Sequence, residues 1–309
     1  MDIFFQQILN GLVLGSIYAL IALGYTMVYG IMGLINFAHG EVVMFGAMVT
    51  ISVVSALTNA GVNLPGWAIV LIGMLVAIPA CMLLGFVIER VAYRPLRGAQ
   101  RLAPLITAIG LSIVLQQVAI LIWGRNYIPF PQVLNHDTVE IFGATITKLQ
   151  IIIVVLCLAI MAGLLVMVEK TKLGRAMRAT SQNPAVAGLM GVNVNTIISA
   201  TFVLGSALGA VAGVMVATNY DQAHYYMGFM IGLKAFTAAV LGGIGNLGGA
   251  VAGGILLGII ESLGAGYIGQ LTGGFLGSNY QDIFAFMVLI LVLIFRPSGL
   301  LGEKMADRA

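Results

Sequence analysis

Long, continuous apolar runs separated by short polar segments organise this chain. The runs are about 20 residues long, which is the length that an α-helix needs to cross about 30 Å of hydrocarbon, whereas the strands of a membrane β-barrel would alternate apolar and polar residues. The pattern therefore predicts an all-α polytopic membrane protein. The predicted spans are residues 5–30, 35–59, 66–89, 104–123, 149–168, 195–218, 228–245, 247–268 and 281–296.

The number of spans is eight or nine. The segment 228–245 is short and interrupted by glycine, so a re-entrant half-helix is the alternative to a full span. Composition supports the membrane class: 60% of the 309 residues are hydrophobic and 8% are charged, with a mean hydropathy of +1.06. A soluble domain usually carries about a quarter charged residues. We therefore expect a lipid bilayer around the protein and no nucleic-acid partner.

Positive charges are concentrated in three short stretches. These are RVAYRPLRGAQR (90–101), KTKLGRAMR (170–178) and RPSGLLGEKMADRA (296–309), which together hold eleven of the 14 Lys and Arg residues. Because cytoplasmic loops collect Lys and Arg, we place all three stretches inside. Nine spans then put the N-terminus outside, together with the polar loop 124–148 and the tyrosine-rich segment 219–228.

Two glycine-dense stretches interrupt the apolar runs, GLINFAHGEVVMFGAMV (33–49) and LGGIGNLGGAVAGG (241–254). Irregular backbone at membrane depth is tolerated only where protein or a water-filled cavity covers it. Broken segments at corresponding places in two halves of a chain indicate a transport pathway. We therefore predict helix breaks beside a translocation pathway. The residues assigned to these breaks are Asn36, His39, Gly40, Glu41, Gly243, Gly245, Asn246, Gly248 and Gly249.

The same two stretches suggest a weak internal repeat. Gly33 aligns with Gly242 and Gly40 with Gly249. We expect a single transmembrane domain over residues 1–309, with halves of about 1–125 and 149–309.

Polar groups at membrane depth have two interpretations. Asn36 is a good residue type for a helix N-cap, and Glu41 favours a first helical turn. Alternatively, Asn36, His39 and Glu41 face an aqueous pathway or a partner subunit, because ionisable groups in a membrane rarely face lipid. Both can hold together. Lys234 and Glu261 are the other charges at this depth, and they either pair with each other or line the pathway.

The sequence contains no strong catalytic motif. Gly243, Gly245 and Gly248 match G-x-G-x-x-G, but a dinucleotide site needs a preceding strand and a βαβ unit. Close helix packing through small residues is the better interpretation. There is no Walker A sequence, and Cys81 and Cys157 lie in apolar runs without metal-ligand spacing. We therefore expect a protein that is not an enzyme and needs no cofactor or metal.

The internal loop EKTKLGRAMRATSQNPAVAGLMGVNVN (169–195) contains a short apolar segment. Asn183-Pro184 indicates a helix start, because Pro is favoured at the first helical position. PAVAGLMGV follows and is bounded by Gly191. Exposed apolar surface marks a partner site, although a helix lying on lipid headgroups is the alternative.

Five segments of the chain resemble a known family. GLINFAHGE, ERVAYRPLR, LGRAMRA followed by NPAVAGLMGVN, FTAAVLGGIGNLGGAVAGG and RPSGLLG are similar to the LivH-type permeases of branched-chain amino-acid ABC importers. The resemblance covers nearly the whole chain. It implies a type II-like permease of the inner membrane that works with a second, LivM-like permease subunit, two ATP-binding subunits and a periplasmic substrate-binding protein.

The resemblance also implies that a short cytoplasmic helix docks on each ATPase, at about Ala176–Gly191 in this chain. The residues assigned to this contact are Arg175, Arg178, Asn183, Pro184, Gly188, Leu189 and Gly191. The expected function is the permease subunit of an ATP-driven importer for branched-chain or related apolar amino acids. The alternatives are the same machine for urea or short-chain amides, and a secondary transporter or channel that works alone.

Overall fold

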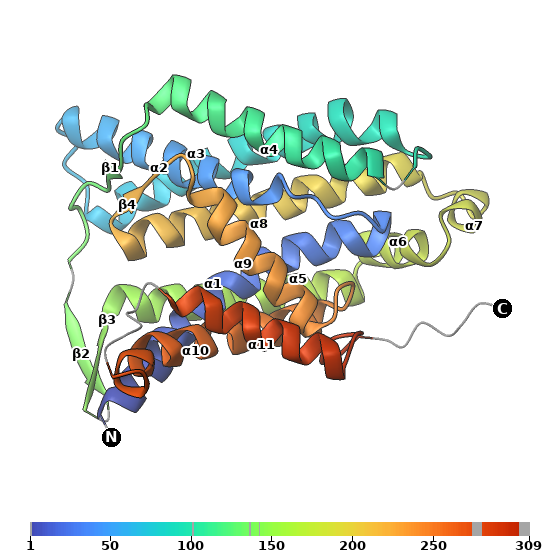
Figure 1. Ribbon diagram of the computed structural model, residues 1–309. Helices are drawn as coiled ribbons and strands as arrows, with labels where there is room; N and C mark the ends of the chain where they lie inside the picture. The colour runs from blue at the N-terminus through green and yellow to red at the C-terminus, as the bar shows by residue number, and fades with distance from the viewer. Residues whose placement is uncertain (1, 101, 136, 142, 274–279, 303–309) are drawn as a thin grey trace. The chain divides into compact units, whose positions relative to one another are not determined.

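A computed structural model describes residues 2–100, 102–135, 137–141, 143–273 and 280–302, and the described chain is predominantly helical (Figure 1). Its longer helices are α1 (Asp2–Met32), α2 (His39–Asn59), α3 (Gly66–Val87), α4 (Leu102–Trp123), α5 (Lys148–Lys170), α8 (Val194–Tyr220), α9 (Met227–Gly242), α10 (Leu247–Leu271) and α11 (Gln281–Phe295). The shorter elements are a π-helical turn (Ile88–Tyr93), a 3-10 turn (Arg94–Leu96), α6 (Lys172–Gln182), α7 (Pro184–Leu189), β1 (Ile128–Pro129), β2 (Thr138–Ile141), β3 (Ala144–Thr147) and β4 (Gln222–Ala223).

The all-α polytopic prediction is confirmed, with a change in the number of long spans. Within the described residues, seven helices are long and apolar enough to cross a membrane. The predicted span 228–245 is instead the 16-residue helix α9, which at 1.5 Å per residue is shorter than about 30 Å of hydrocarbon. Gly243 and Gly245 end it with φ values of 107° and 99°, a backbone conformation that favours glycine.

The described chain forms two compact units built from interleaved segments. Unit 1 comprises residues 1–26, 136–162 and 234–309, and unit 2 comprises residues 27–135 and 163–233. Of the basic residues used for the topology, Arg101, Lys304 and Arg308 lie outside the described residues.

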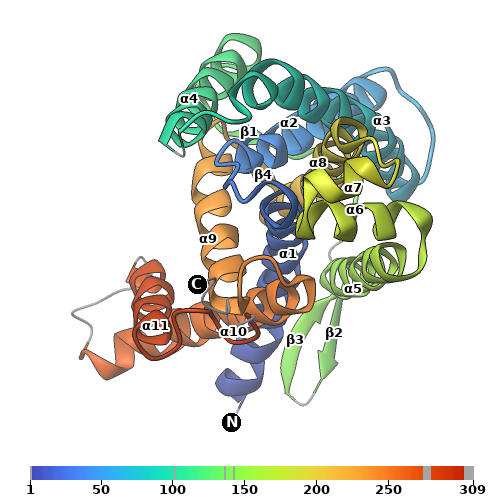
Figure 2. The same ribbon diagram turned by 90° about the vertical axis from the view of Figure 1, so that its right-hand side faces the viewer.

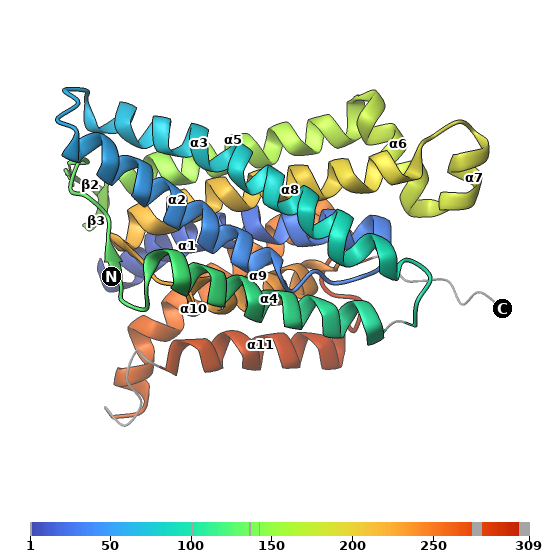
Figure 3. The ribbon, with the colours of Figure 1, turned by 90° about the horizontal axis from the view of Figure 1, so that it is seen from above.

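In unit 2, α2, α3 and α8 pack against one another, and α4 lies beside α2 (Figures 1 and 3). The outer faces of α3 and α4 carry exposed apolar side chains, such as Leu83 (65% exposed) and Leu121 (85% exposed). The packed faces carry small residues instead. Apolar side chains on the outside and small residues on the packed faces are expected when lipid is the solvent. In lipid, burying an apolar side chain between helices gains no hydrophobic free energy.

Glycine allows α2 and α8 to approach each other at backbone distance. A Cβ atom added at Gly46 would lie 2.7 Å from the Cα atom of Ala210, and one added at Gly213 would collide with the backbone of Val43 and Ala47. A real side chain at either glycine would force the two helices apart. The crossing of α2 and α8 therefore depends on the absence of side chains at these two positions.

The connecting segments of unit 2 gather at its two opposite ends. At one end, β1 pairs with β4 in antiparallel register, and Gly66 at the start of α3 lies against the backbone of Val133. At the other end, Arg97 donates a hydrogen bond to Asn195 near the start of α8, which follows α6 and α7. Both described basic segments of unit 2 thus share one end, as two segments on the same side of a membrane must.

Unit 1 also depends on glycine at a helix crossing. A Cβ atom added at Gly15 of α1 would lie 2.7 Å from the Cα atom of Ile255 of α10, and Cβ atoms added at Gly254 and Gly258 of α10 would collide with backbone atoms of α1. The antiparallel hairpin of β2 and β3 is joined to α1 through the side chain of Gln6, which accepts a hydrogen bond from the backbone N–H of Thr145 at 2.8 Å. Sequence patterning did not predict this hairpin.

The close approach in unit 2 can be tested with two leucine substitutions. We expect Gly213→Leu to lower the yield and thermal stability of the protein in detergent, because overpacking costs about 1–3 kcal/mol or more at a tight crossing. Gly110→Leu in α4 is the control, since a Cβ atom there meets nothing within 4 Å. Melting by size-exclusion fluorescence measures both variants, and equal melting temperatures would refute the assignment.

The two ends of unit 2 can be placed relative to the membrane by cysteine labelling. We expect Ala99→Cys, beside Arg97, to react with a membrane-impermeant maleimide only after cells are opened, and Asn126→Cys to react in intact spheroplasts. Both positions are exposed, whereas the native Cys81 and Cys157 are buried. The opposite labelling pattern would overturn the orientation drawn from the positive charges.

Candidate functional site: the polar start of α2

The helix α2 begins partway along the bundle of unit 2 instead of at its end (Figure 3). After α1 ends at Met32, residues 33–38 turn back into the bundle, and the helix starts only at His39. Gly33 makes the turn with a φ of 64°. As a result, Asn36, His39 and Glu41 are 4%, 2% and 0% exposed. The segment places an amide, an imidazole and a carboxylate inside a membrane-embedded bundle.

The capping role considered for Asn36 is wrong. The N-cap residue of α2 is Ala38, which makes no side-chain cap. The side-chain oxygen of Asn36 instead accepts a hydrogen bond from the hydroxyl of Tyr93 at 2.9 Å. Tyr93 belongs to the π-helical turn that continues α3, so the amide joins the turn before α2 to another helix. Tertiary contact overrode the local preference of Asn for a cap.

Glu41 lies in the first turn of α2, and α4 supplies its hydrogen-bond donors. The hydroxyl of Ser112 and the side-chain N–H of Gln116 both donate to Glu41 Oε1, each at 2.8 Å. Sequence reasoning missed both donors. The sequence feature that could have revealed these donors is a pair of polar residues four positions apart, on one face of an otherwise apolar span.

The second oxygen of Glu41 faces the start of α9. A Cβ atom added at Gly228 would lie 2.6 Å from Glu41 Oε2, and one added at Gly40 would collide with the carbonyl of Gly228. Within the described part of the chain, Oε2 accepts no hydrogen bond. A carboxylate held this way can accept a hydrogen bond from an ammonium or hydroxyl group. The described residues include no group of three His, Cys, Asp or Glu side chains that could hold a metal ion.

The second predicted break lies between α9 and α10, in unit 1. Asn246 accepts a hydrogen bond from the backbone N–H of Gly249 at 2.9 Å and donates to the carbonyl of Leu301 at 3.0 Å. A Cβ atom added at Gly249 would collide with the carbonyl of Gly242, whereas one added at Gly248 would touch only the Asn246 side chain, at 3.5 Å. This break therefore anchors the chain that follows α11.

Lys234 and Glu261 pair with each other, which decides between their two interpretations. Lys234 Nζ lies 2.7 Å from Glu261 Oε1 and 2.8 Å from Asp282 Oδ1, and the hydroxyl of Tyr18 donates to the same Glu261 oxygen at 3.3 Å. The three charged side chains come from α9, α10 and α11 in unit 1. Buried charges require such partners, since an uncompensated charge at this depth is costly.

The loop 169–195 folds into two short helices that lie side by side at the start of α8 (Figure 2). The predicted helix start is confirmed: Asn183 caps α7 by accepting from the backbone N–H groups of Ala185 and Val186, each at 3.1 Å, and Pro184 is the first helical residue. Gly191 ends the segment with a φ of 86°.

Sequence reasoning did not predict α6 as a separate helix. The sequence feature that could have revealed α6 is Thr171, a residue type that caps helices. In the structure its hydroxyl accepts from the backbone N–H of Gly174 at 3.1 Å. The two predicted contact arginines lie on α6. Arg175 is exposed, and Arg178 donates to the carbonyl of Val168 at 2.8 Å, at the end of α5.

The tip formed by α7 is both apolar and exposed. Leu189 is 87% exposed, Met190 is 80% exposed and Val186 is 52% exposed. Gly188 lies between them, with open space where a Cβ atom would stand. Three large apolar side chains at one exposed tip indicate a surface that another molecule covers.

Comparison of the sequence with known proteins identifies its family. Residues 7–293 match the family model described as branched-chain amino acid transport system / permease component. The high-affinity branched-chain amino acid transport system permease protein LivH of Escherichia coli (strain K12) is 45% identical over 99% of this chain and 97% of its own length. BraD of Pseudomonas aeruginosa, of the same description, is 44% identical over 99% of this chain and 98% of its own length.

A probable branched-chain amino acid transport permease protein LivH of Methanocaldococcus jannaschii is 28% identical over 96% of this chain and 92% of its own length. No solved structure matches the chain.

Interrupted helices, a buried polar helix start and an apolar outer face define a multi-pass helical permease of the inner membrane. The chain belongs to the family of permease components of branched-chain amino acid transport systems.

Substitutions at Glu41 test the hydrogen bonds at the start of α2. We expect Glu41→Gln to fold with near-normal stability, because its amide oxygen can still accept from Ser112 and Gln116. Glu41→Leu leaves two buried donors without an acceptor, at a cost of about 1–3 kcal/mol for each, and should lower the melting temperature clearly. Glu169→Leu at an exposed position of α5 is the control. Equal melting of the Gln and Leu variants would contradict this account.

Proposed function

We propose that this protein is the permease subunit of an ATP-driven importer that moves branched-chain or related apolar amino acids across the inner membrane. The observation that carries the proposal is its near full-length similarity to the permeases LivH and BraD, at 45% and 44% identity. The substrate is taken from the descriptions of these relatives.

The proposed partners are a second, LivM-like permease subunit, two ATP-binding subunits and a periplasmic substrate-binding protein. The exposed tip of α7 supports an ATP-binding partner, because Leu189 and Met190 would leave water on docking. Burying apolar surface of this kind contributes about 25 cal/mol per Å². In this proposal Arg175, Arg178 and Gly188 lie beside the contact, while Asn183, Pro184 and Gly191 hold the shape of α7.

The proposed pathway runs past the start of α2. A branched-chain amino acid carries an ammonium group, a carboxylate and an apolar side chain. Glu41 supplies an acceptor that suits the ammonium, and Asn36, His39 and Gly40 stand beside it. The surrounding helices are apolar and lined with glycine, so a transient contact at Glu41 fits a subunit that passes on a substrate selected elsewhere. The break at Gly243, Gly245, Asn246, Gly248 and Gly249 completes the proposed set of pathway elements.

Transport by the complete complex in proteoliposomes tests the function. The permease, the proposed second permease, the ATP-binding subunits and the binding protein are reconstituted, and uptake of labelled leucine is measured with and without internal ATP. We expect ATP-dependent uptake that unlabelled isoleucine and valine inhibit. Uptake of urea or a short-chain amide instead would refute the amino-acid substrate, and uptake by the permease alone would refute the ATP-driven machine.

The ATPase contact is tested by Leu189→Glu in the same assay. We expect normal membrane insertion and loss of coupled uptake, because a carboxylate at the centre of an apolar contact must be desolvated without a partner. Leu64→Glu is the matched control, since Leu64 is also an exposed leucine (45% exposed) in a connecting segment, at the opposite end of unit 2. Substrate-stimulated ATP hydrolysis at the normal rate in Leu189→Glu would rule out this contact.

A further inference from the structure

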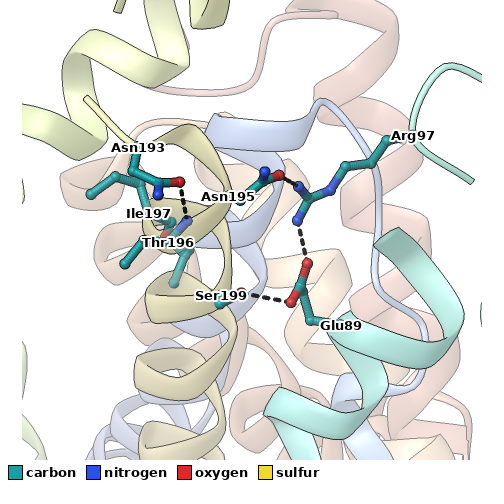
Figure 4. A network of polar contacts seen from close by, with 8 residues as sticks. Glu89, Arg97, Asn193, Asn195, Thr196, Ile197 and Ser199 are labelled. Atoms are coloured by element: carbon teal, nitrogen blue, oxygen red, sulfur yellow. Dashed lines mark hydrogen bonds and ion pairs between the residues drawn. The ribbon is translucent and has the colours of Figure 1, made fainter. Parts of the chain in front are cut away.

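A buried carboxylate at the end of α3 has no part in the site described above. Glu89 is 0% exposed and lies in the π-helical turn Ile88–Tyr93. It forms an ion pair with Arg97 through Oε1, and its Oε2 accepts a hydrogen bond from the hydroxyl of Ser199 at 2.6 Å (Figure 4). Both carboxylate oxygens are therefore committed to groups from outside the turn.

The partners of Glu89 bring together the loop after α3 and the start of α8. Arg97 bridges Glu89 and the side-chain oxygen of Asn195, and Asn195 and Ser199 lie one turn apart on α8 (Figure 4). Burial lowers the pKa of Arg97, and the Glu89 carboxylate opposes this shift only in part, but a guanidinium keeps its charge in either case. The start of α8 is thus held to the π-helical turn directly by the hydrogen bond from Ser199 to Glu89, and indirectly through Arg97, which pairs with Glu89 and donates to Asn195.

The same start of α8 is attached closely to α7. Only residues 190–193 separate the two helices, and Asn193 caps α8 by accepting from the backbone N–H of Thr196 at 3.2 Å. A backbone hydrogen bond from Val192 to the carbonyl of Ala187, at 3.0 Å, folds this connection against α7. A displacement of α7 therefore pulls directly on Asn195 and Ser199.

The other end of the π-helical turn reaches the start of α2. Tyr93 is 1% exposed, and its hydroxyl donates to Asn36, which precedes the helix that carries His39 and Glu41. The ring of Tyr93 also packs on Phe202 of α8, with centroids 5.2 Å apart. Glu89 and Tyr93, four residues apart in one turn, thus connect the α7 end of unit 2 to its buried polar site.

A π-helical turn has physical features that suit a movable part. It contains about one residue more than an α-helical turn, is rare in proteins, and occurs often at functional sites. Shifting it by one residue would rotate the groups on either side by about 100° relative to each other, from 3.6 residues per α-helical turn. Such a shift would change the positions of Glu89 and Tyr93 together.

We propose that Glu89 and Tyr93 are positioning residues that couple movement of α7 to the start of α2, through the contacts of the π-helical turn with Ser199 and Asn36 and, by way of Arg97, with Asn195. The inference rests on the proposed function, because it assigns to α7 the contact with an ATP-binding subunit. Neither residue touches the transported molecule. Their role is to make the position of the polar site depend on the position of α7.

The test uses Tyr93→Phe and Ser199→Ala, which each remove one hydroxyl from opposite ends of the connection and leave the packing in place. Uptake of leucine and hydrolysis of ATP are measured together in proteoliposomes that contain the complete complex. We expect each variant to lower leucine taken up per ATP hydrolysed by roughly fivefold or more, the scale of a typical coupling between sites, while ATP hydrolysis stays near normal. The double variant should lose little more than either single variant, because both changes break one connection.

Tyr226→Phe, at an exposed tyrosine of the opposite end, is the control and should keep the normal ratio. Glu89→Gln adds a check on the ion pair and should also lower the ratio, with Glu169→Gln at an exposed position as its control. Normal ratios in Tyr93→Phe and Ser199→Ala would overturn the inference, as would equal losses of uptake and hydrolysis together with lower melting temperatures, which indicate a structural role only. A wild-type complex that hydrolyses ATP but takes up no leucine would refute the proposed substrate instead.

Discussion

Close backbone contact between helices is the constraint on which the rest of this structure depends. In lipid, apolar side chains gain nothing by turning inward, so helices associate through van der Waals packing and hydrogen bonds. Gly46 and Gly213 meet this requirement between α2 and α8, and Gly15 and Gly258 meet it between α1 and α10. Leucine-rich faces are left for the outside. The abundance of glycine in the sequence thus serves close packing in part, and ten described glycines, Gly33 and Gly243 among them, have positive φ values.

Close packing also lets the chain place polar groups at membrane depth without exposing them to lipid. Each described buried charge of the spans has partners from another helix: Glu41 has Ser112 and Gln116, and Glu261 has Lys234 and Tyr18. These contacts join α2 to α4 in unit 2, and α1 to α9 and α10 in unit 1. These contacts add to close packing in fixing which helices are neighbours, because separating such a pair would leave a buried charge without its partner.

The end of unit 2 that carries α6 and α7 follows a different rule from the spans. There α6 and α7 are short and are capped by Thr171 and Asn183, and Asn193 caps the start of the long helix α8, each by accepting from a backbone N–H. Such caps hold a segment in shape without help from lipid or a core. A movement at the surface can reach the interior only if rigid parts connect the two. This end supplies an exposed apolar tip at α7 and a hydrogen-bonded connection through Glu89.

The sequence by itself determined the class of protein, the approximate limits of most spans, both glycine-rich breaks and the start of α7 at Asn183-Pro184. These features are local: they depend on the length of an apolar run, on the φ values open to glycine and on capping by a side chain two or three residues away. Only the tertiary structure decided that Asn36 binds Tyr93 and does not cap α2, that Ser112 and Gln116 hold Glu41, and that Lys234 pairs with Glu261 and Asp282. In each case the partner lies on a helix far away in the sequence. Apolar spans resemble one another too closely for periodicity to reveal which faces meet, and the meeting faces are set by close packing among all the helices at once.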